Sequence, residues 1–191
     1  MASPFGTHPQ LSAFGVVKVK KSLSKIASEI QNRDTPNDVF ITPLPLAKIQ
    51  IDMIKAEPQE VWMDPFKNDG SYFNQFPQHE GVEHEWTEIL YGRDFFTYRG
   101  EVDIICSNPP FSLINKCLEK FVELKPRVIS ILIGTMNVTP SRFERMEKAG
   151  YTLTEYRLCA WAPIVGMACV IQWERTNLLT TPNIKTYIGR F

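Results

Sequence analysis

The sequence predicts an α/β domain in which helices cover both faces of a mostly parallel sheet. From residue 61 onward, short apolar runs alternate with amphipathic segments, the pattern of strands joined by helical crossovers. Residues 128–133, VISILI, form a continuous apolar run, which is typical of a strand buried on both faces. With 191 residues, the chain suits one domain with a substantial core. We expect that domain at residues 38–175, between an N-terminal extension (1–37) and a polar tail (176–191).

Two helices are predicted before the first strand. The first lies in the N-terminal extension and follows a basic stretch that contains Lys18, Lys20 and Lys21. These lysines are candidates for contact with nucleic-acid phosphate, although such a cluster is more often a solvated face. The second helix, at residues 46–54, is entered through prolines, which the first turn of a helix tolerates.

The remaining elements follow in order. Four short apolar elements come first, at residues 61–63, 86–90, 94–96 and 102–106. The later elements are a helix, the buried strand, a charged helix and two further strands, at residues 113–124, 128–133, 142–149, 151–158 and 167–174. Gly150 follows the charged helix, as expected of a residue that ends a helix.

The composition limits the possible functions. Lys plus Arg and Asp plus Glu each number 21, and this zero net charge neither supports nor excludes nucleic-acid binding. No apolar run could span a membrane and the N-terminus lacks a signal-peptide pattern, so we expect a soluble intracellular protein. His79 and His84 lie in a polar connection, and we predict no metal site. Four cysteines in apolar surroundings indicate reduced core residues: Cys106, Cys117, Cys159 and Cys169.

Polar residues follow the predicted strands near the point where each ends. They are Asp64, Glu88, Asp94 and Asn108. Ligands of parallel α/β sheets bind at the carboxyl ends of the strands, near a topological switch point. We therefore expect these four side chains to converge on one crevice.

The first two acids favour a particular kind of ligand. Asp64 is followed by a turn with a single glycine, Gly70, which lacks the pattern of a pyrophosphate-binding loop. A carboxylate at this point suits an amine better than a phosphate. Glu88 follows Asp64 at close to the ~20-residue offset at which an acid holds a ribose diol in dinucleotide-binding folds. Together the two acids suggest a nucleoside that carries an ammonium and a sulfonium group.

These motifs resemble a known family. The series Asp-Pro-Phe, a second-strand acid, Asp-Phe and Asn-Pro-Pro-Phe is that of amino-methyltransferases that use S-adenosylmethionine. It is most similar to adenine-specific DNA methyltransferases of the compact phage and virus type. The resemblance spans roughly residues 38–175 and implies a Rossmann-like three-layer α/β/α fold with a mostly parallel seven-stranded sheet.

The resemblance assigns S-adenosylmethionine binding to particular residues. Glu88 would hold the ribose, and Asp94 and Phe95 the adenine of the cofactor. The family often has glycine where this chain has Asn68, a residue type that tolerates the left-handed conformation. The implied cofactor-binding residues are Phe40, Thr42, Pro43, Asp64, Pro65, Phe66, Gly70, Glu88, Asp94, Phe95 and Asn108.

The implied catalytic tip is Asn108, Pro109, Pro110 and Phe111. An amine on an aromatic ring is a poor nucleophile because its lone pair is delocalised into the ring. The Asn108 side-chain oxygen and the Pro109 carbonyl could accept its two hydrogens, and the prolines would fix both acceptors in advance. Phe111 would offer a ring face to a flipped base.

The expected function is methylation of the exocyclic amino group of adenine in DNA. The Asn-Pro-Pro-Phe motif alone leaves cytosine open, and RNA adenine, protein glutamine and an idle cofactor-binding subunit are further alternatives. Arg142 and Arg145 follow the strand at 128–133 and could contact phosphate, or form an ordinary exposed helix face. Too few residues follow Phe111 for a recognition domain, so we expect specificity to be loose, or to come from loops or a partner chain.

Overall fold

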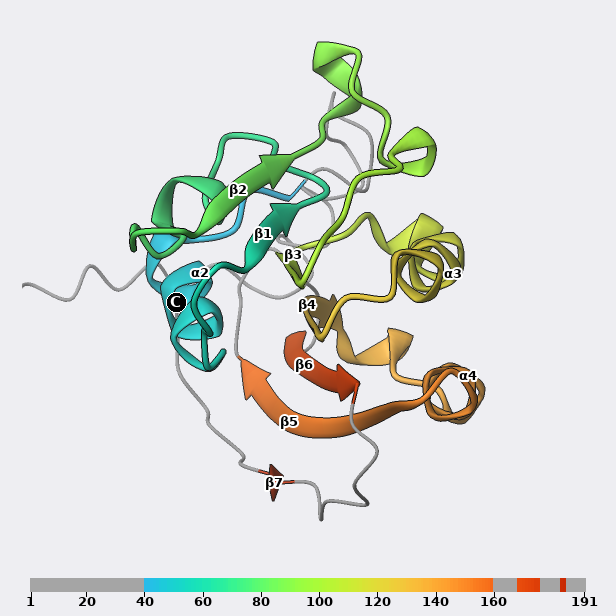
Figure 1. Cartoon of the computed structure of the whole chain (residues 1–191). Coiled ribbons are helices and arrows are strands. Elements are labelled where there is room, and N and C mark those ends of the chain that lie inside the picture. The colour runs from blue at the N-terminus through green and yellow to red at the C-terminus, as the bar shows by residue number, and fades with distance from the viewer. Residues whose placement is uncertain (1–39, 160–167, 176–182, 185–191) are drawn as a thin grey trace, which may run out of the picture.

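The computed structural model describes residues 40–159, 168–175 and 183–184 (Figure 1). Its strands are β1 (Val61–Asp64), β2 (Glu83–Trp86), β3 (Ile104–Ser107), β4 (Val128–Gly134), β5 (Tyr151–Cys159), β6 (Ala168–Arg175) and the two-residue β7 (Asn183–Ile184). Its α-helices in these residues are α2 (Leu44–Asp52), α3 (Ile114–Leu124) and α4 (Pro140–Lys148).

The strands form one sheet in the order β2-β1-β3-β4-β6-β5-β7. β6 runs antiparallel to both of its neighbours, β4 and β5, whereas the pairs β1–β2, β1–β3, β3–β4 and β5–β7 are parallel. The mostly parallel α/β fold that the sequence predicts is therefore confirmed.

Helices cover the two faces of the sheet. Side chains alternate between the faces of a strand, and Trp62 and Ile104 pack with α2 residues such as Ile51 on one face. Their neighbours Met63 and Ile105 pack on the other face with residues of α3 and α4. Figure 1 shows α2 on one side of the sheet, with α3 and α4 on the other. The arrangement is the predicted three-layer α/β/α architecture.

Several local predictions are also confirmed. Every residue of β4 is buried, as expected of a strand covered on both faces. α2 begins directly after Pro43 and has a proline in its first turn. After α4, Gly150 adopts a left-handed φ of 85°. All four cysteines are buried and free.

The prediction of a strand at residues 86–90 is wrong. β2 ends at Trp86, and Ile89–Tyr91 form an exposed 3-10 turn. The Glu88 carboxylate caps this turn by accepting a hydrogen bond from the Leu90 N–H, which favours the turn over an extended backbone. β2 itself has the polar sequence EHEW because it is the edge strand of the sheet, so its side chains are only partly buried.

The element predicted at residues 94–96 is not a strand. Asp94 caps a 3-10 turn at Phe95–Thr97 by accepting a hydrogen bond from the Phe96 N–H. Asp94 therefore lies in the connection between β2 and β3, instead of at the end of a strand of its own.

The topological switch point lies between β1 and β3. The chain passes from β1 to β2 on one side and then returns to place β3 on the other side of β1. Asp64 ends β1 and Ser107 ends β3, so these two residues meet at the switch point.

The predicted N-terminal helix with Lys18, Lys20 and Lys21 lies outside the described residues, as does most of the tail. Among the described helices, none combines the length and apolar character needed to cross a membrane.

Candidate functional site

A cavity of about 440 Å³ opens at the carboxyl edge of the sheet, a volume suited to a small-molecule ligand. The loops after β1, β2 and β3 and the segment before α2 line it. The predicted site residues in its wall are Phe40, Thr42, Pro65, Phe66, Glu88, Asp94, Phe95, Asn108 and Pro110. Of the four side chains expected to converge on one crevice, Glu88, Asp94 and Asn108 line this cavity, whereas Asp64 does not.

Further lining residues were not assigned a role from the sequence. They are Lys67, Asn68, Asp69, Ser71, Tyr72, Ile89, Leu90, Phe96 and Leu113. Most lie within a few positions of a predicted acid. Their closeness in sequence to the strand ends is therefore the feature that could have predicted them. Tyr72 lies further along the chain from these acids. It lines the cavity because the turn after β1 folds back.

Five of the residues predicted to bind the cofactor or form the catalytic tip lie outside the cavity wall: Pro43, Asp64, Gly70, Pro109 and Phe111. Pro43 precedes α2, and its carbonyl accepts hydrogen bonds from the first turn of that helix. Gly70 is buried in the turn after β1 with φ of 90°, where an added Cβ would lie 2.5 Å from Nδ2 of Asn74. These two residues shape the loops around the cavity.

Asp64 is completely buried at the switch point. Its Oδ1 accepts hydrogen bonds from Oγ of Ser107 at 2.7 Å and from the N–H of Phe66 at 3.3 Å. Burial raises the pKa of Asp64 to about 7, and the Ser107 hydrogen bond opposes that rise. The side chain therefore ties the tips of β1 and β3 together beneath the cavity.

Glu88 is held by the turn after β1. Asn68 has φ of 47°, the left-handed conformation that was expected to be tolerable there, and its N–H donates to Oε2 of Glu88 at 2.9 Å. Oε1 accepts from the N–H of Leu90 at 3.2 Å. Because each carboxylate oxygen can accept more than one hydrogen bond, Glu88 keeps capacity to bind hydroxyl groups in the cavity.

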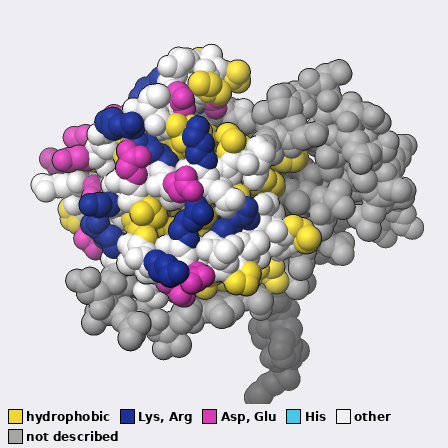
Figure 2. Space-filling view, turned by 90° about the vertical axis from the view of Figure 1, so that its right-hand side faces the viewer, with side chains coloured by type: hydrophobic (Ala, Val, Ile, Leu, Met, Phe, Trp, Pro, Cys, Tyr) yellow, Lys and Arg dark blue, Asp and Glu magenta, His cyan; other side chains and the backbone are white. Residues whose placement is uncertain are grey.

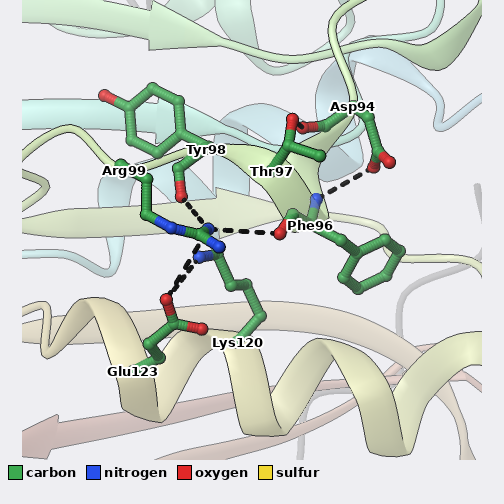
Figure 3. A network of polar contacts seen from close by, with 7 residues as sticks. All are labelled: Asp94, Phe96, Thr97, Tyr98, Arg99, Lys120 and Glu123. Carbon is green, nitrogen blue, oxygen red and sulfur yellow. Dashed lines mark hydrogen bonds and ion pairs between the residues drawn. The ribbon is translucent and has the colours of Figure 1, made fainter.

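The loop that carries Asp94 and Phe95 is fastened to α3 (Figure 3). The Arg99 guanidinium donates to the carbonyls of Phe96 and Tyr98 and lies 3.6 Å from Glu123 on the helix. Buried Lys120 approaches the same carboxylate at 2.8 Å. These contacts hold the turn that follows Asp94, whose Oδ1 accepts from the Phe96 N–H while the side chain lines the cavity.

Asn108 follows β3 and is anchored by its side-chain nitrogen. Nδ2 donates to the carbonyl of Phe40 at 3.3 Å and to Oγ1 of Thr42 at 3.2 Å. A carbonyl can only accept a hydrogen bond, so the nitrogen must face Phe40 and Oδ1 must point elsewhere. Oδ1 is buried and has no hydrogen-bond partner among the described residues.

The two arginines predicted to contact phosphate join α4 to α3. Arg145 pairs with Glu119 at 2.8 Å, whereas Arg142 donates to the side chain of Asn115 and the carbonyl of Asn137. On the face that carries these helices, Lys and Arg side chains lie among Asp and Glu side chains and form no single basic patch in the described residues (Figure 2). Phosphate contact by Arg142 or Arg145 stays a prediction.

Large apolar side chains are exposed around the cavity edge. In the part of the chain that the structure describes they are Ile41, Leu44, Ile89, Leu90, Tyr91, Leu113 and Met136. They lie just before α2 or at its first residue, or in the connections after β2, β3 and β4, which places them at the carboxyl edge. We refer to these exposed side chains as the apolar rim.

No family model matches the chain, and no curated protein matches it in sequence. Solved structures do match. A protein from Listeria monocytogenes, proposed to be a class I S-adenosylmethionine-dependent methyltransferase, superposes with a TM-score of 0.60 at 12% identity, over 90% of this chain and 74% of that one. The chain has the class I methyltransferase fold.

Two further structures share the class I methyltransferase fold with this chain. The type I restriction-modification methyltransferase subunit from Streptococcus thermophilus gives a TM-score of 0.55 at 13% identity, over 87% of this chain and 50% of that one. A protein from Pyrococcus horikoshii, proposed to be an RNA methyltransferase, gives a TM-score of 0.53 at 13% identity. The match covers 81% of this chain and 98% of that one. The chain thus spans half the length of the restriction-modification subunit, and at these identities the likeness establishes the fold.

Proposed function

We propose that the protein is an S-adenosylmethionine-dependent methyltransferase that acts on the exocyclic amino group of adenine in DNA. Asn108 carries this proposal. Its Nδ2 is held by two acceptors, and its buried Oδ1 lacks a partner in the described residues, so the amide keeps one acceptor for an incoming N–H. A buried acceptor without a partner is costly and therefore points to a ligand group.

The cavity fits the proposed cofactor. The Glu88 carboxylate has room to accept from ribose hydroxyls, and Asp94 keeps an oxygen for an adenine amino group. Phe66, Phe95 and Phe96 supply apolar walls for a flat ring. When bound, S-adenosylmethionine supplies a methyl group on a cationic sulfur.

The chain's own residues would prepare the acceptor amine. Asn108 Oδ1 and the Pro109 carbonyl would each accept one amine hydrogen, which localises the nitrogen lone pair. Pro109 and Pro110 restrict the backbone at this point, so little reorganisation is needed. No strong base is required for this role.

DNA is proposed as the acceptor because the motif series is most similar to adenine-specific DNA methyltransferases. The shared fold with a restriction-modification methyltransferase subunit is consistent with this choice. The apolar rim suits the flat, apolar face of an unstacked base.

The test is transfer of a radiolabelled methyl group to single-stranded DNA, duplex DNA, RNA and protein in parallel. We expect label on adenine in DNA, and at least as much on single-stranded as on paired DNA, because unstacking a base costs a few kcal/mol. Label on RNA or on a protein glutamine, with all DNA adenines unlabelled, would overturn the acceptor assignment and leave the cofactor site standing.

One observation favours a second candidate, a cofactor-binding subunit that requires a partner chain. The exposed rim residues, above all Met136 and Leu90 with 90% and 81% of their surface accessible, could be covered by another protein. This candidate predicts cofactor binding by the isolated chain without transfer to any acceptor, and transfer once the partner is added.

A further inference from the structure

Thr87 directly precedes Glu88 and is buried, with 2% of its surface exposed. All three of its polar groups bond to the end of β1 or to the turn that follows it. The Thr87 N–H donates to the carbonyl of Asp64 at 3.1 Å, and the Thr87 carbonyl accepts from the N–H of Lys67 at 3.1 Å. The Thr87 hydroxyl donates to the carbonyl of Pro65 at 2.6 Å. The direction of this last bond is fixed, because a carbonyl can only accept a hydrogen bond.

The turn that Thr87 holds is the one that holds the Glu88 side chain. Asn68 follows Lys67 in this turn, and its N–H donates to Oε2 of Glu88 at 2.9 Å. Asn68 has a left-handed φ of 47°, a conformation that costs energy in any residue other than glycine and needs support from its surroundings. The orientation of the Glu88 carboxylate therefore depends on the turn, and the position of the turn depends on Thr87.

A side-chain contact joins the same two segments. The Lys67 ammonium lies over the rings of Trp86 and Phe73, at 4.1 and 4.7 Å from their centroids. Trp86 directly precedes Thr87, and an ammonium is attracted to the electron-rich face of an aromatic ring. The turn after β1 and the end of β2 are thus joined by backbone, hydroxyl and aromatic contacts. Of these, the hydroxyl contact can be removed by a substitution that keeps the branched shape of the side chain.

We propose that Thr87 is a positioning residue that holds the Glu88 carboxylate in the orientation required by the ribose hydroxyls of the cofactor. The inference rests on the proposed cofactor site. Removal of the hydroxyl takes a donor from the buried Pro65 carbonyl, which favours movement of the turn or entry of water. Either change displaces Asn68. The second bond to Glu88, from the N–H of Leu90, does not involve this turn, so the loss should be partial.

The test compares Thr87→Val with Thr87→Ser, and takes Thr154→Val as the matched control. Thr154 lies on β5 outside the cavity wall, and its hydroxyl also donates to a backbone carbonyl, that of Gln172. We expect Thr87→Val to weaken S-adenosylhomocysteine binding in calorimetry roughly 2- to 10-fold, the equivalent of one neutral hydrogen bond. Thr87→Ser keeps the hydroxyl and should bind nearly as wild type does, and so should Thr154→Val.

A double-mutant cycle with Glu88→Ala separates positioning from a general structural role. If Thr87 acts through the Glu88 carboxylate, Thr87→Val should cause little further loss of S-adenosylhomocysteine affinity once that carboxylate has been removed. A loss of the same size in both backgrounds would overturn the positioning role. Thermal unfolding shows whether each variant is folded.

A second readout needs no ligand. Lys67 and Asn68 form the only Lys-Asn pair in the sequence, so labelling lysine with a ¹³C carbonyl and asparagine with ¹⁵N selects the Asn68 amide in NMR spectra. In wild type this amide should exchange slowly with solvent, because it is bonded to Glu88. In Thr87→Val it should shift and exchange faster, and in Thr87→Ser it should return toward its wild-type state. An unchanged Asn68 amide in folded Thr87→Val would also refute the proposal.

The two readouts distinguish this proposal from the proposed function. If wild type binds no S-adenosylhomocysteine but the Asn68 amide responds as described, Thr87 positions Glu88 and the cofactor assignment fails. If wild type binds the ligand and Thr87→Val changes neither the affinity nor the amide, the cofactor assignment stands and the positioning role fails.

Discussion

The ring of Phe40 stacks on the ring of Phe111, with centroids 5.8 Å apart and 29° between the ring planes. A planar base inserted between them would need about 7 Å, twice the 3.4 Å base-stacking distance. Phe111 also packs against the core. The Phe40 ring therefore occupies a face of Phe111 that the sequence assigned to a flipped base, and it must move before a base can stack there.

Truncation of Phe40 should strengthen acceptor binding. Phe40→Ala removes the competing ring but keeps the backbone carbonyl that holds Asn108. An aromatic pair contributes about 0.5–1.5 kcal/mol, so we expect a roughly 2- to 10-fold lower acceptor KM. Phe111→Ala should raise it. Steady-state kinetics on single-stranded DNA measures both, with Phe143→Ala, on α4, as the control. A higher KM for Phe40→Ala would show that its ring forms part of the base site.

Replacement of Asn108 should affect transfer far more than cofactor binding. Asn108→Ala removes the acceptor for the amine, and loss of one preorganised partner costs on the order of 100- to 1000-fold in rate. Affinity for S-adenosylhomocysteine, measured by calorimetry, should be nearly unchanged. Retained turnover would place the catalytic group elsewhere.

Glu88→Gln should weaken cofactor binding. The hydrogen bonds expected from ribose hydroxyls change from charge-assisted to neutral, and this difference corresponds to about 1 kcal/mol. The matched control is Glu85→Gln, on β2, because Glu85 pairs with Arg93 outside the cavity wall. Equal calorimetric affinities for wild type and Glu88→Gln would refute the ribose assignment.

Asp64 should make the protein less stable as the pH rises. Its pKa is raised from 3.8 to about 7, so between these values the unfolded chain is ionised while the folded chain holds the proton. The free energy of unfolding should therefore fall from about pH 4 to pH 7, by at most about 4 kcal/mol from this group.

Urea unfolding across this pH range measures the effect. Asp64→Asn should flatten that part of the profile. Ser107→Ala removes a hydrogen bond that lowers the Asp64 pKa, and should extend the decline to higher pH. Identical profiles for wild type and Asp64→Asn would mean that the carboxyl group is not protonated in the folded protein.

Arg142 should contribute more than Arg145 to DNA binding. Arg145 is already paired with Glu119, whereas Arg142 donates to neutral oxygens of Asn115 and Asn137. Arg142→Gln should reduce the slope of log affinity against log salt by about 1, the value for one phosphate contact. Arg145→Gln should change it less. Fluorescence anisotropy at several salt concentrations gives the slopes, and equal slopes for Arg142→Gln and wild type would exclude the contact.

The sequence by itself determined the layers of the fold and the edge at which the site lies. Continuous burial of β4 follows from its unbroken apolar run, and the switch-point rule predicts that Glu88, Asp94 and Asn108 surround one cavity. These features depend on local patterns, such as hydrophobic periodicity and strand ends, which a single sequence records directly.

Tertiary structure alone decided what each side chain does at that edge. Asp64 has the residue type of a ligand-binding acid, but burial and the Ser107 hydroxyl make it a link beneath the cavity. The orientation of Asn108 depends on Phe40 and Thr42, more than sixty residues earlier in the chain. Hydrogen-bond direction and desolvation depend on which distant groups are brought together, and no local pattern in the sequence contains that information.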